Sequence, residues 1–186
     1  MGITIYRIIT APVLVLLIFN KQLDWFKWLL ALSFFTDAID GYLARRYKVT
    51  SIAGARLDSI GDDLTIVVAT FGMIAFKSTF LKQEIFLFVL LFSLFALQMV
   101  LAFIKYGKMT SFHTYSAKVA AVLQGIFLIL LFFLPNPLYK LFYAAAFVTT
   151  FELIEELIIT FLLPKWETNV KGLCWIIKAE KKVRYE

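Results

Sequence analysis

Long apolar segments alternate with short polar ones along the whole of this 186-residue chain. Each apolar segment is long enough to cross the hydrocarbon of a bilayer as a helix, which takes ~20 residues. Turn-forming residues, such as the Pro-Asn-Pro sequence at 135–137, separate neighbouring segments. The pattern predicts an all-α integral membrane bundle of six transmembrane helices, at residues 3–20, 25–46, 51–76, 84–104, 115–134 and 138–163.

The composition agrees with a membrane protein. Hydrophobic residues make up 61% of the chain and 20 residues are phenylalanine, which is more apolar surface than a soluble core of this length could bury. The first segment lacks a cationic start and a small-residue cleavage site, so we expect a retained helix rather than a signal peptide. The single cysteine, Cys174, excludes a disulfide within the chain.

The C-terminal segment, residues 164–186, differs from the rest of the chain. It holds six lysine and arginine residues together with Trp166, Trp175 and Ile176. Basic groups with apolar anchors bind the anionic surface of a membrane. We therefore expect a six-helix domain at 1–163 and a basic, amphipathic cytoplasmic tail at 164–186 that lies at the membrane interface. Much of the net charge of +6 is there, and no groove-reading module accompanies it, which argues against nucleic acid as a partner.

Four aspartates lie inside two of the predicted spans. Asp37 and Asp40 are near the end of the second span, and Asp58 and Asp62 are near the start of the third. A charged side chain at membrane depth costs at least ~2.5–3.5 kcal/mol, and residues three or four apart share one face of a helix. Two acidic pairs on neighbouring antiparallel helices therefore predict a shared cavity with a compensating cation. Oxygen ligands without histidine or cysteine favour Mg²⁺ or Mn²⁺ over zinc.

Small and basic residues stand at fixed places between these aspartates. The chain reads D-x2-D-G-x2-A-R-x8-G-x3-D-x3-D from Asp37 to Asp62. This run resembles the signature of the CDP-alcohol phosphotransferase family at all eight fixed positions. Members of that family join a CDP-activated lipid or alcohol to a second alcohol and release CMP, so the resemblance implies a phospholipid-synthesising enzyme whose donor is CDP-diacylglycerol.

The resemblance also implies a role for each residue of the motif. Two divalent ions, Mg²⁺ or Mn²⁺, would be held by Asp37, Asp40, Asp58 and Asp62. Asp62 would in addition act as the general base on the acceptor hydroxyl. The CDP part of the donor would be bound by Asp37, Gly41, Ala44, Arg45, Gly54 and Asp58. Because the family is generally dimeric, we expect a homodimer.

Basic residues indicate the orientation in the membrane. If both termini are cytoplasmic, the cytoplasmic segments hold 14 lysine and arginine residues and the opposite side holds five. Cytoplasmic loops of membrane proteins carry an excess of these residues. We therefore expect a multi-pass protein, of the cell inner membrane, whose active site faces the cytoplasm.

Several acceptor alcohols are compatible with the sequence. Glycerol 3-phosphate, inositol phosphate or a similar polyol would each fit, and serine or unphosphorylated inositol are alternatives. The first span resembles that of phosphatidylglycerophosphate synthases, which usually have Pro after the third aspartate and Lys after the fourth, where this chain has Ser59 and Asp63. The candidate acceptor-binding residues are Arg7, Arg56 and Lys118; Arg7 has a second interpretation, snorkelling to the cytoplasmic interface.

Three glutamates on one face of the sixth span also have two interpretations. Glu152, Glu155 and Glu156 either contribute to the acceptor pocket or form structural pairs with Arg7, Arg56 or a neighbouring chain. The single histidine, at position 113, is interpreted as a surface residue.

A cation-binding membrane transporter is the alternative from another functional class. Acidic residues within membrane spans would suffice for it. It accounts for neither Gly41 and Gly54 near the aspartates nor Arg45 beside them, so the transferase is the preferred hypothesis.

Overall fold

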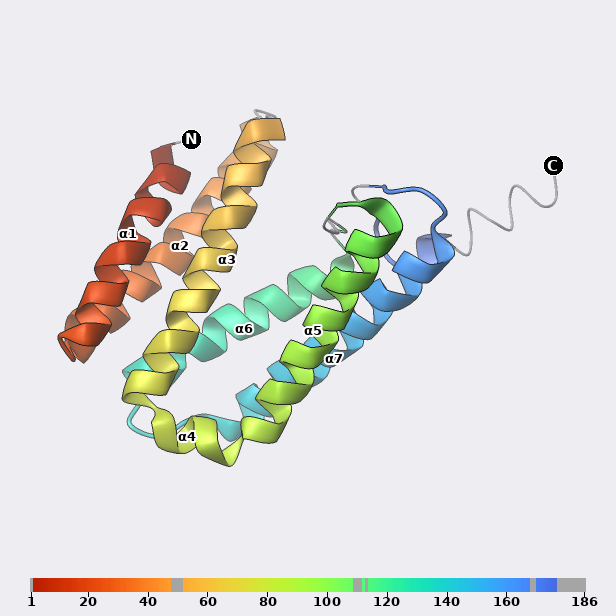
Figure 1. Ribbon diagram of the computed structural model, residues 1–186. Helices are drawn as coiled ribbons and strands as arrows, with labels where there is room; N and C mark the ends of the chain where they lie inside the picture. The colour runs from red at the N-terminus through yellow and green to blue at the C-terminus, as the bar shows by residue number, and fades with distance from the viewer. Residues whose placement is uncertain (1, 48–51, 109–111, 113, 168–169, 177–186) are drawn as a thin grey trace, which may run out of the picture. The chain divides into compact units, whose positions relative to one another are not determined.

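Within the described part of the structure every regular element is an α-helix. The computed structural model describes residues 2–47, 52–108, 112, 114–167 and 170–176, and their side chains except those of 2–8, 37, 38, 40–47, 52–60, 62 and 63. Figure 1 shows the helices in chain order, which are α1 (Gly2–Phe19), α2 (Leu23–Tyr47), α3 (Ile52–Phe76), α4 (Ser78–Gln83), α5 (Ile85–Tyr106), α6 (Tyr115–Phe133) and α7 (Tyr139–Leu162). The all-α prediction is confirmed.

The helix boundaries lie close to the predicted ones. The six predicted segments correspond to α1, α2, α3, α5, α6 and α7, with ends that differ by at most two residues, and α1 continues through Pro12. The short α4 lies outside the predicted segments. It begins just after Lys77, whose ammonium donates hydrogen bonds to the carbonyl oxygens of Leu134 (2.8 Å) and Pro135 (3.2 Å). These carbonyl oxygens lie at the C-terminus of α6, where a cation is favourable because a helix C-terminus carries partial negative charge.

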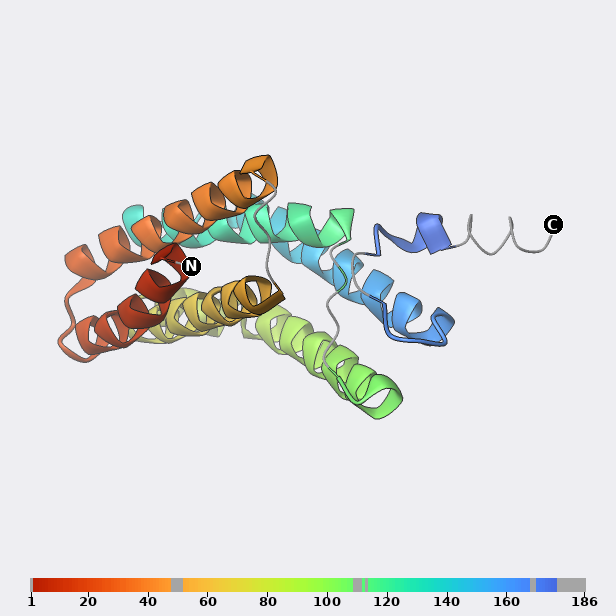
Figure 2. The same cartoon turned by 90° about the horizontal axis from the view of Figure 1, so that it is seen from above.

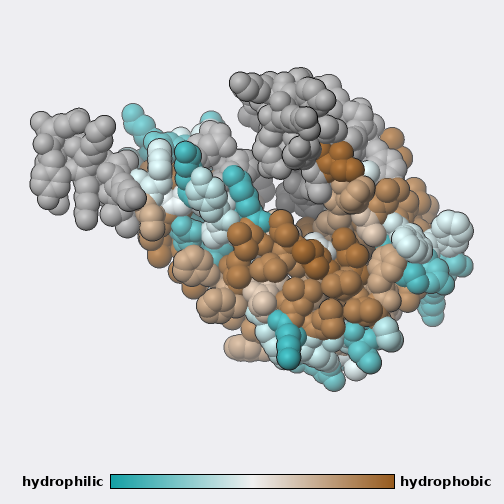
Figure 3. Space-filling view, turned by 180° about the vertical axis from the view of Figure 1, so that it is seen from behind, coloured by the Kyte–Doolittle hydropathy of each residue, from teal (hydrophilic) through white to brown (hydrophobic). Residues whose placement is uncertain are grey.

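Among the residues that the structure describes, two helices, α5 and α6, are long and apolar enough to cross a membrane. Within the described residues, α1 and α3 contribute shorter apolar stretches, at 9–19 and 64–76. Many large hydrophobic side chains are exposed, and Figure 3 shows one face on which hydrophobic residues predominate, with hydrophilic residues at its margins. Exposed apolar surface on this scale marks contact with a membrane or with protein. These observations indicate a membrane protein. The full set of six spans remains a prediction.

Contacts within the chain divide it into two compact units. The first unit contains Met1–Gln83 and Leu128–Pro137, and the second contains Glu84–Phe127 and Leu138–Glu186. The beginning of α6 thus packs in the second unit and its end packs in the first. Each unit has its own core.

An aromatic cluster forms the centre of the first unit. The Phe26 side chain on α2 is fully buried, and its ring centroid lies 5.4 Å from that of Phe76 and 5.0 Å from that of Phe132. Gly72 on α3 lies directly against this ring, because a Cβ added to it would be 2.3 Å from Phe26 Cζ. Small residues allow membrane helices to approach closely. The contact between Gly72 and Phe26 therefore sets how α3 packs on α2.

Replacing Gly72 by valine is expected to destabilise the first unit. The new side chain would overlap the Phe26 ring, which Phe76 and Phe132 hold in place, and overpacking of this kind costs ~1–3 kcal/mol. For a chain of this size the melting temperature should fall by about 3–9 °C, measured by thermal unfolding in detergent. Ala75→Val, an exposed change on the same helix, is the control. Equal melting temperatures for the two variants would contradict the packing role, whereas adding Phe26→Leu to Gly72→Val should restore part of the loss.

In the second unit α5 packs along α7. Two side chains at the end of α5 donate hydrogen bonds to the C-terminal carbonyl groups of α7. The Lys105 ammonium donates hydrogen bonds of 2.9 Å to the carbonyl oxygens of Thr160 and Phe161. The Tyr106 hydroxyl donates to the carbonyl oxygens of Thr160 (3.0 Å) and Leu163 (2.8 Å). The last carbonyls of a helix have no partner within the helix, so α5 supplies the donors that α7 lacks.

Candidate active site

The two acidic pairs of the motif lie on neighbouring helices of the first unit. Asp37 lies ten residues before the end of α2, and Asp62 lies ten residues after the start of α3, so each is ~15 Å from the helix end beside residues 48–51. Asp40 and Asp58 are seven and six residues from the same helix ends, which is ~10 Å. The helices run in opposite directions (Figure 1). The backbone therefore places both pairs at matching levels, in the half of each helix that is nearer residues 48–51.

The helices that carry the motif are described, although the motif side chains are not. The side chains of all eight motif residues lie outside the described part, and so do those of Arg7 and Arg56. α1 packs along both α2 and α3. Figure 2 shows α2 and α3 diverging toward the ends that carry the motif. The acidic pairs therefore lie along the diverging part of the two helices, ~10–15 Å before its wide end.

Both glycines of the motif have helical backbone: Gly41 lies in the interior of α2 and Gly54 in the first turn of α3. A glycine in a helix interior costs ~1 kcal/mol relative to alanine, and neither glycine is needed to turn the chain. Each lies within about one turn of an aspartate, Asp40 or Asp58. A missing side chain at these positions lets a ligand approach the backbone closely.

The four aspartates are the candidate metal ligands. Within the side chains that the structure describes, no three histidine, cysteine, aspartate or glutamate residues come together as a metal site. The motif supplies carboxylate oxygens only, which is the set of donors that Mg²⁺ and Mn²⁺ prefer. The chemistry of the donor set therefore fits a hard divalent cation.

Buried hydroxyl groups lie one helical turn from the motif. Ser33 on α2 and Thr65 on α3 are 1% and 3% exposed, and the Thr65 hydroxyl donates a hydrogen bond of 2.8 Å to the backbone carbonyl one turn earlier. Ser33 precedes Asp37 by four residues and Thr65 follows Asp62 by three, so each shares a helix face with an aspartate. Neither hydroxyl is among the site residues predicted from the sequence, although the one-turn spacing from an aspartate is visible there.

Lys118, the remaining candidate acceptor ligand, lies near the start of α6 in the second unit. Its side chain is exposed, and its ammonium lies 5.4 Å from the centroid of the Tyr115 ring, where a cation is attracted by the aromatic face. Further along α6 the Gln124 amide donates a hydrogen bond of 2.6 Å to the hydroxyl of Thr149 on α7. His113 lies outside the described residues, so its assignment to the surface stays a prediction, as does an acceptor role for Lys118.

Two of the three glutamates on α7 have uncharged hydrogen-bond donors as partners. Glu156 is buried and accepts a hydrogen bond from the buried side-chain amide of Gln98 on α5. Glu155 accepts one from the Ser116 hydroxyl at the start of α6 and one of 2.8 Å from the backbone N–H of Leu173. These contacts favour structural pairing, with partners other than the arginines considered from the sequence.

Glu155 also holds the C-terminal part of the described chain. Gly172 has a φ of +145°, and a Cβ there would lie 2.9 Å from Glu155 Oε1, so both the backbone conformation and the contact require glycine. On either side of Gly172, Val170 and Ile176 belong to a buried cluster that also contains Phe112, Ile159 and Leu163. Residues 170–176, within the predicted interfacial tail, are thus packed against the end of α7.

Comparison with known proteins adds a family match and several relatives. The profile of the CDP-alcohol phosphatidyltransferase family matches residues 1–155, a range that includes the whole motif. The CDP-diacylglycerol–glycerol-3-phosphate 3-phosphatidyltransferase of Blochmanniella floridana is 41% identical over 73 residues, which are 37% of this chain and 38% of that protein. The protein of the same name from Haemophilus influenzae is 35% identical over 82 residues, which are 42% of this chain and 44% of that protein.

A third relative, from Pseudomonas fluorescens, has the same name again and is 39% identical over 72 residues, which are 36% of each chain. The matched part thus covers less than half the length of each of these relatives. No solved structure matches the chain.

Proposed function

Because this chain belongs to the CDP-alcohol phosphatidyltransferase family, we propose that it transfers a phosphatidyl group from CDP-diacylglycerol to glycerol 3-phosphate and releases CMP. The observation that carries this proposal is the complete eight-residue motif from Asp37 to Asp62 inside the matched range. Three similar proteins have this donor and this acceptor in their names. In the reaction the acceptor hydroxyl oxygen forms a bond to the lipid-bearing phosphorus as the bond from that phosphorus to CMP breaks.

Two divalent ions, Mg²⁺ or Mn²⁺, would be held by the four aspartates of the motif. When bound, such ions neutralise a diphosphate and stabilise the charge that develops on its leaving group. The aspartates at positions 37, 40 and 58 serve as ligands in this proposal. Arg45, two residues before the end of α2, adds positive charge that does not depend on a metal and can pair with a phosphate oxygen of the donor.

Asp62 has a second role as general base. It lies one turn further along α3 than Asp58 and on the same face, so it is deeper than the donor phosphates that Asp58 helps to hold. A carboxylate at this depth can accept the proton of the acceptor hydroxyl as that hydroxyl attacks. Gly41, Ala44 and Gly54 present little side-chain bulk to the donor.

The acceptor would be oriented by basic residues. Arg7, Arg56 and Lys118 are the candidates, because a phosphate on the acceptor requires positive charge to bind it. Ser59 and Asp63 stand where phosphatidylglycerophosphate synthases usually have Pro and Lys, so inositol phosphate or a similar polyol is kept as the second candidate acceptor. Serine and unphosphorylated inositol are the neutral alternatives.

We propose the rest of the architecture as it is predicted from the sequence. In this proposal six spans form the domain at 1–163, residues 164–186 lie on the cytoplasmic membrane surface, and two copies form a dimer. The excess of lysine and arginine on one side supports a cytoplasmic active site. Mass measurement in native-like lipid tests the dimer.

Purified protein with CDP-diacylglycerol and Mg²⁺ is expected to release CMP when glycerol 3-phosphate is added. The same assay with inositol phosphate, serine and inositol identifies the acceptor by kcat/KM. Faster turnover with inositol phosphate than with glycerol 3-phosphate would replace the first acceptor by the second. Absence of CMP release with every acceptor, together with cation flux into proteoliposomes, would instead favour the transporter.

A further inference from the structure

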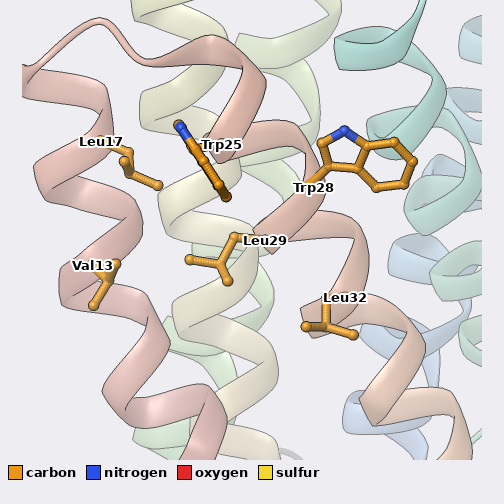
Figure 4. A pocket seen from close by; sticks show the side chains of 6 residues that line it. All are labelled: Val13, Leu17, Trp25, Trp28, Leu29 and Leu32. Carbon is orange, nitrogen blue, oxygen red and sulfur yellow. The ribbon is translucent and has the colours of Figure 1, made fainter.

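The buried side of α2 leads to the motif. Phe26, Leu30 and Ser33 are each no more than 1% exposed, and helix positions three or four apart share one face. Asp37 is the next position of this series, four residues after Ser33. The other side of α2 is different, because Trp28 is 65% exposed and lines an open apolar pocket beside α1 (Figure 4). Ser33 therefore lies on the inner side of α2, one turn before the motif.

The Ser33 hydroxyl differs from other helical hydroxyls of this protein. Those of Thr65, Thr70 and Thr150 each donate a hydrogen bond of 2.8–2.9 Å to the carbonyl four residues earlier, a common arrangement in helices. Among the described residues no hydrogen bond of the Ser33 hydroxyl is found, although the Ser33 carbonyl accepts one of 2.9 Å from Thr36. Buried polar groups in native proteins nearly always have a partner. The Ser33 hydroxyl therefore indicates a partner at the site beside it.

The carboxylate at position 37 is the acceptor that helix geometry favours. A helical side chain leans toward the N-terminus and covers the turn before its own Cα, so the residue four positions later is well placed to reach a serine on the same face. A carboxylate accepts hydrogen bonds at both of its oxygens. One that binds a metal ion therefore still has room for a donor, and such outer donors orient the ligands of metal sites.

The two buried hydroxyls beside the motif differ in what they can offer to a carboxylate. The proton of the Thr65 hydroxyl is donated to the Gly61 carbonyl at 2.8 Å, and a hydroxyl has one proton to donate. Of the two, Ser33 is the one with a proton available for a carboxylate. This difference suits the proposed roles, because Asp37 is a ligand whereas Asp62 must itself accept a proton.

We propose that Ser33 is a positioning residue of the metal site, whose hydroxyl donates a hydrogen bond to the Asp37 carboxylate when that carboxylate binds the divalent ion. This inference rests on the proposed function, because it takes Asp37 as a metal ligand. The hydrogen bond determines which oxygen of the carboxylate faces the ion. Ser33 therefore contributes to the affinity for metal rather than to the chemical step.

Removing the hydroxyl is expected to weaken metal binding without destabilising the protein. Ser33→Ala should raise the Kd for Mn²⁺ by about 10–100-fold, the usual effect of losing such an outer donor. The Kd is measured from the EPR signal of free Mn²⁺ with purified protein and Mn²⁺ alone. The melting temperature without metal should not fall, because the change removes a buried hydroxyl that has no hydrogen bond among the described residues. An unchanged Kd would overturn the proposal, and a lower metal-free melting temperature beside it would assign Ser33 a structural role.

The same variant should separate metal affinity from turnover. In Ser33→Ala the Mn²⁺ concentration for half-maximal CMP release should rise by a factor similar to that of the Kd, while kcat at saturating Mn²⁺ stays close to the wild-type value. Thr36→Ala is the matched control, since its hydroxyl is also within one turn of Asp37 but donates to a backbone carbonyl. It should leave the Kd for Mn²⁺ near that of the wild-type protein. An equal rise in both variants would overturn the specific role of Ser33.

A double-substitution experiment tests whether Asp37 is the partner. Substitutions are coupled when the two residues are in contact. In an Asp37→Ala background, Ser33→Ala should therefore have no further effect on the Kd for Mn²⁺, whereas in an Asp40→Ala background it should weaken binding as it does in the wild-type protein. A full effect in the Asp37→Ala background would show that the hydroxyl has another partner and would overturn the proposal.

Failure of the proposed function has a different signature. It would appear as absence of CMP release by the wild-type protein with every acceptor, whatever its affinity for Mn²⁺. Failure of the Ser33 proposal alone would appear as normal CMP release by the wild-type protein together with an unchanged Kd for Mn²⁺ in Ser33→Ala.

Discussion

Replacing Asp40 by alanine is expected to abolish CMP release without unfolding the protein. The change removes one of the carboxylates proposed to hold divalent ions on the donor diphosphate, and the ions contribute several kcal/mol to the stabilisation of transition-state charge. A loss of that size corresponds to a fall in rate of roughly 10³-fold. CMP release measured over a range of Mg²⁺ and Mn²⁺ concentrations, with the melting temperature in detergent as a check on folding, tests this expectation.

A matched control lies on the same helix. Asp24 is also an aspartate of α2, but its side chain is 85% exposed and pairs with Lys27 at 2.5 Å. Exposed pairs of this kind contribute ~1 kcal/mol or less, so Asp24→Ala should leave both turnover and the metal dependence close to those of the wild-type protein. Nearly normal CMP release by Asp40→Ala would sink the metal assignment, and an equal loss in both variants would show that the effect is not specific to the motif.

Asp62→Asn is expected to separate donor binding from chemistry. Asparagine keeps the shape of the side chain and one oxygen that can act as a ligand, but it is not basic at any working pH. The variant should therefore still be stabilised thermally by CDP-diacylglycerol with Mg²⁺, while kcat falls by about 10²-fold or more, the value of a well-placed general base.

Two neighbouring substitutions show whether Asp62 has this role alone. Asp58→Asn should lose donor binding and turnover together, because Asp58 is proposed as a metal ligand. Asp63→Asn should keep both. If Asp62→Asn instead lost donor binding and retained its rate at saturating donor, Asp62 would be a metal ligand only, and loss of turnover in Asp63→Asn would make that residue the base.

Much of the helical framework is predictable from the sequence because it depends on local patterns. A run of apolar residues of the right length determines where a helix lies, and turn-forming residues such as Pro135 determine where it stops. The two acidic pairs reach matching levels for the same reason, since the short connection between α2 and α3 makes them antiparallel. The side-chain geometry of the motif, from Asp37 to Asp62, stays a prediction.

Contacts between distant segments are not predictable in this way. Glutamates within an apolar helix such as α7 indicate that partners must exist, yet Gln98 is 58 residues from Glu156 and Ser116 is 39 residues from Glu155. No spacing within a helix specifies such pairs. The requirement for glycine at position 172 is similarly long-range, because it arises from the Glu155 carboxylate as well as from the local backbone conformation.

The close approach of Gly72 to Phe26 has a geometric consequence at a distance. Phe26 precedes Asp37 by 11 residues on α2 and Gly72 follows Asp62 by ten on α3, so the contact lies ~15 Å from each acidic pair along the helix axis. If one helix rotates by about 5° relative to the other at this contact, its aspartates move by roughly 1 Å, and misplacement by that amount can cost ~10²-fold in rate. The relative position of the four aspartates therefore depends on a packing contact that includes none of them.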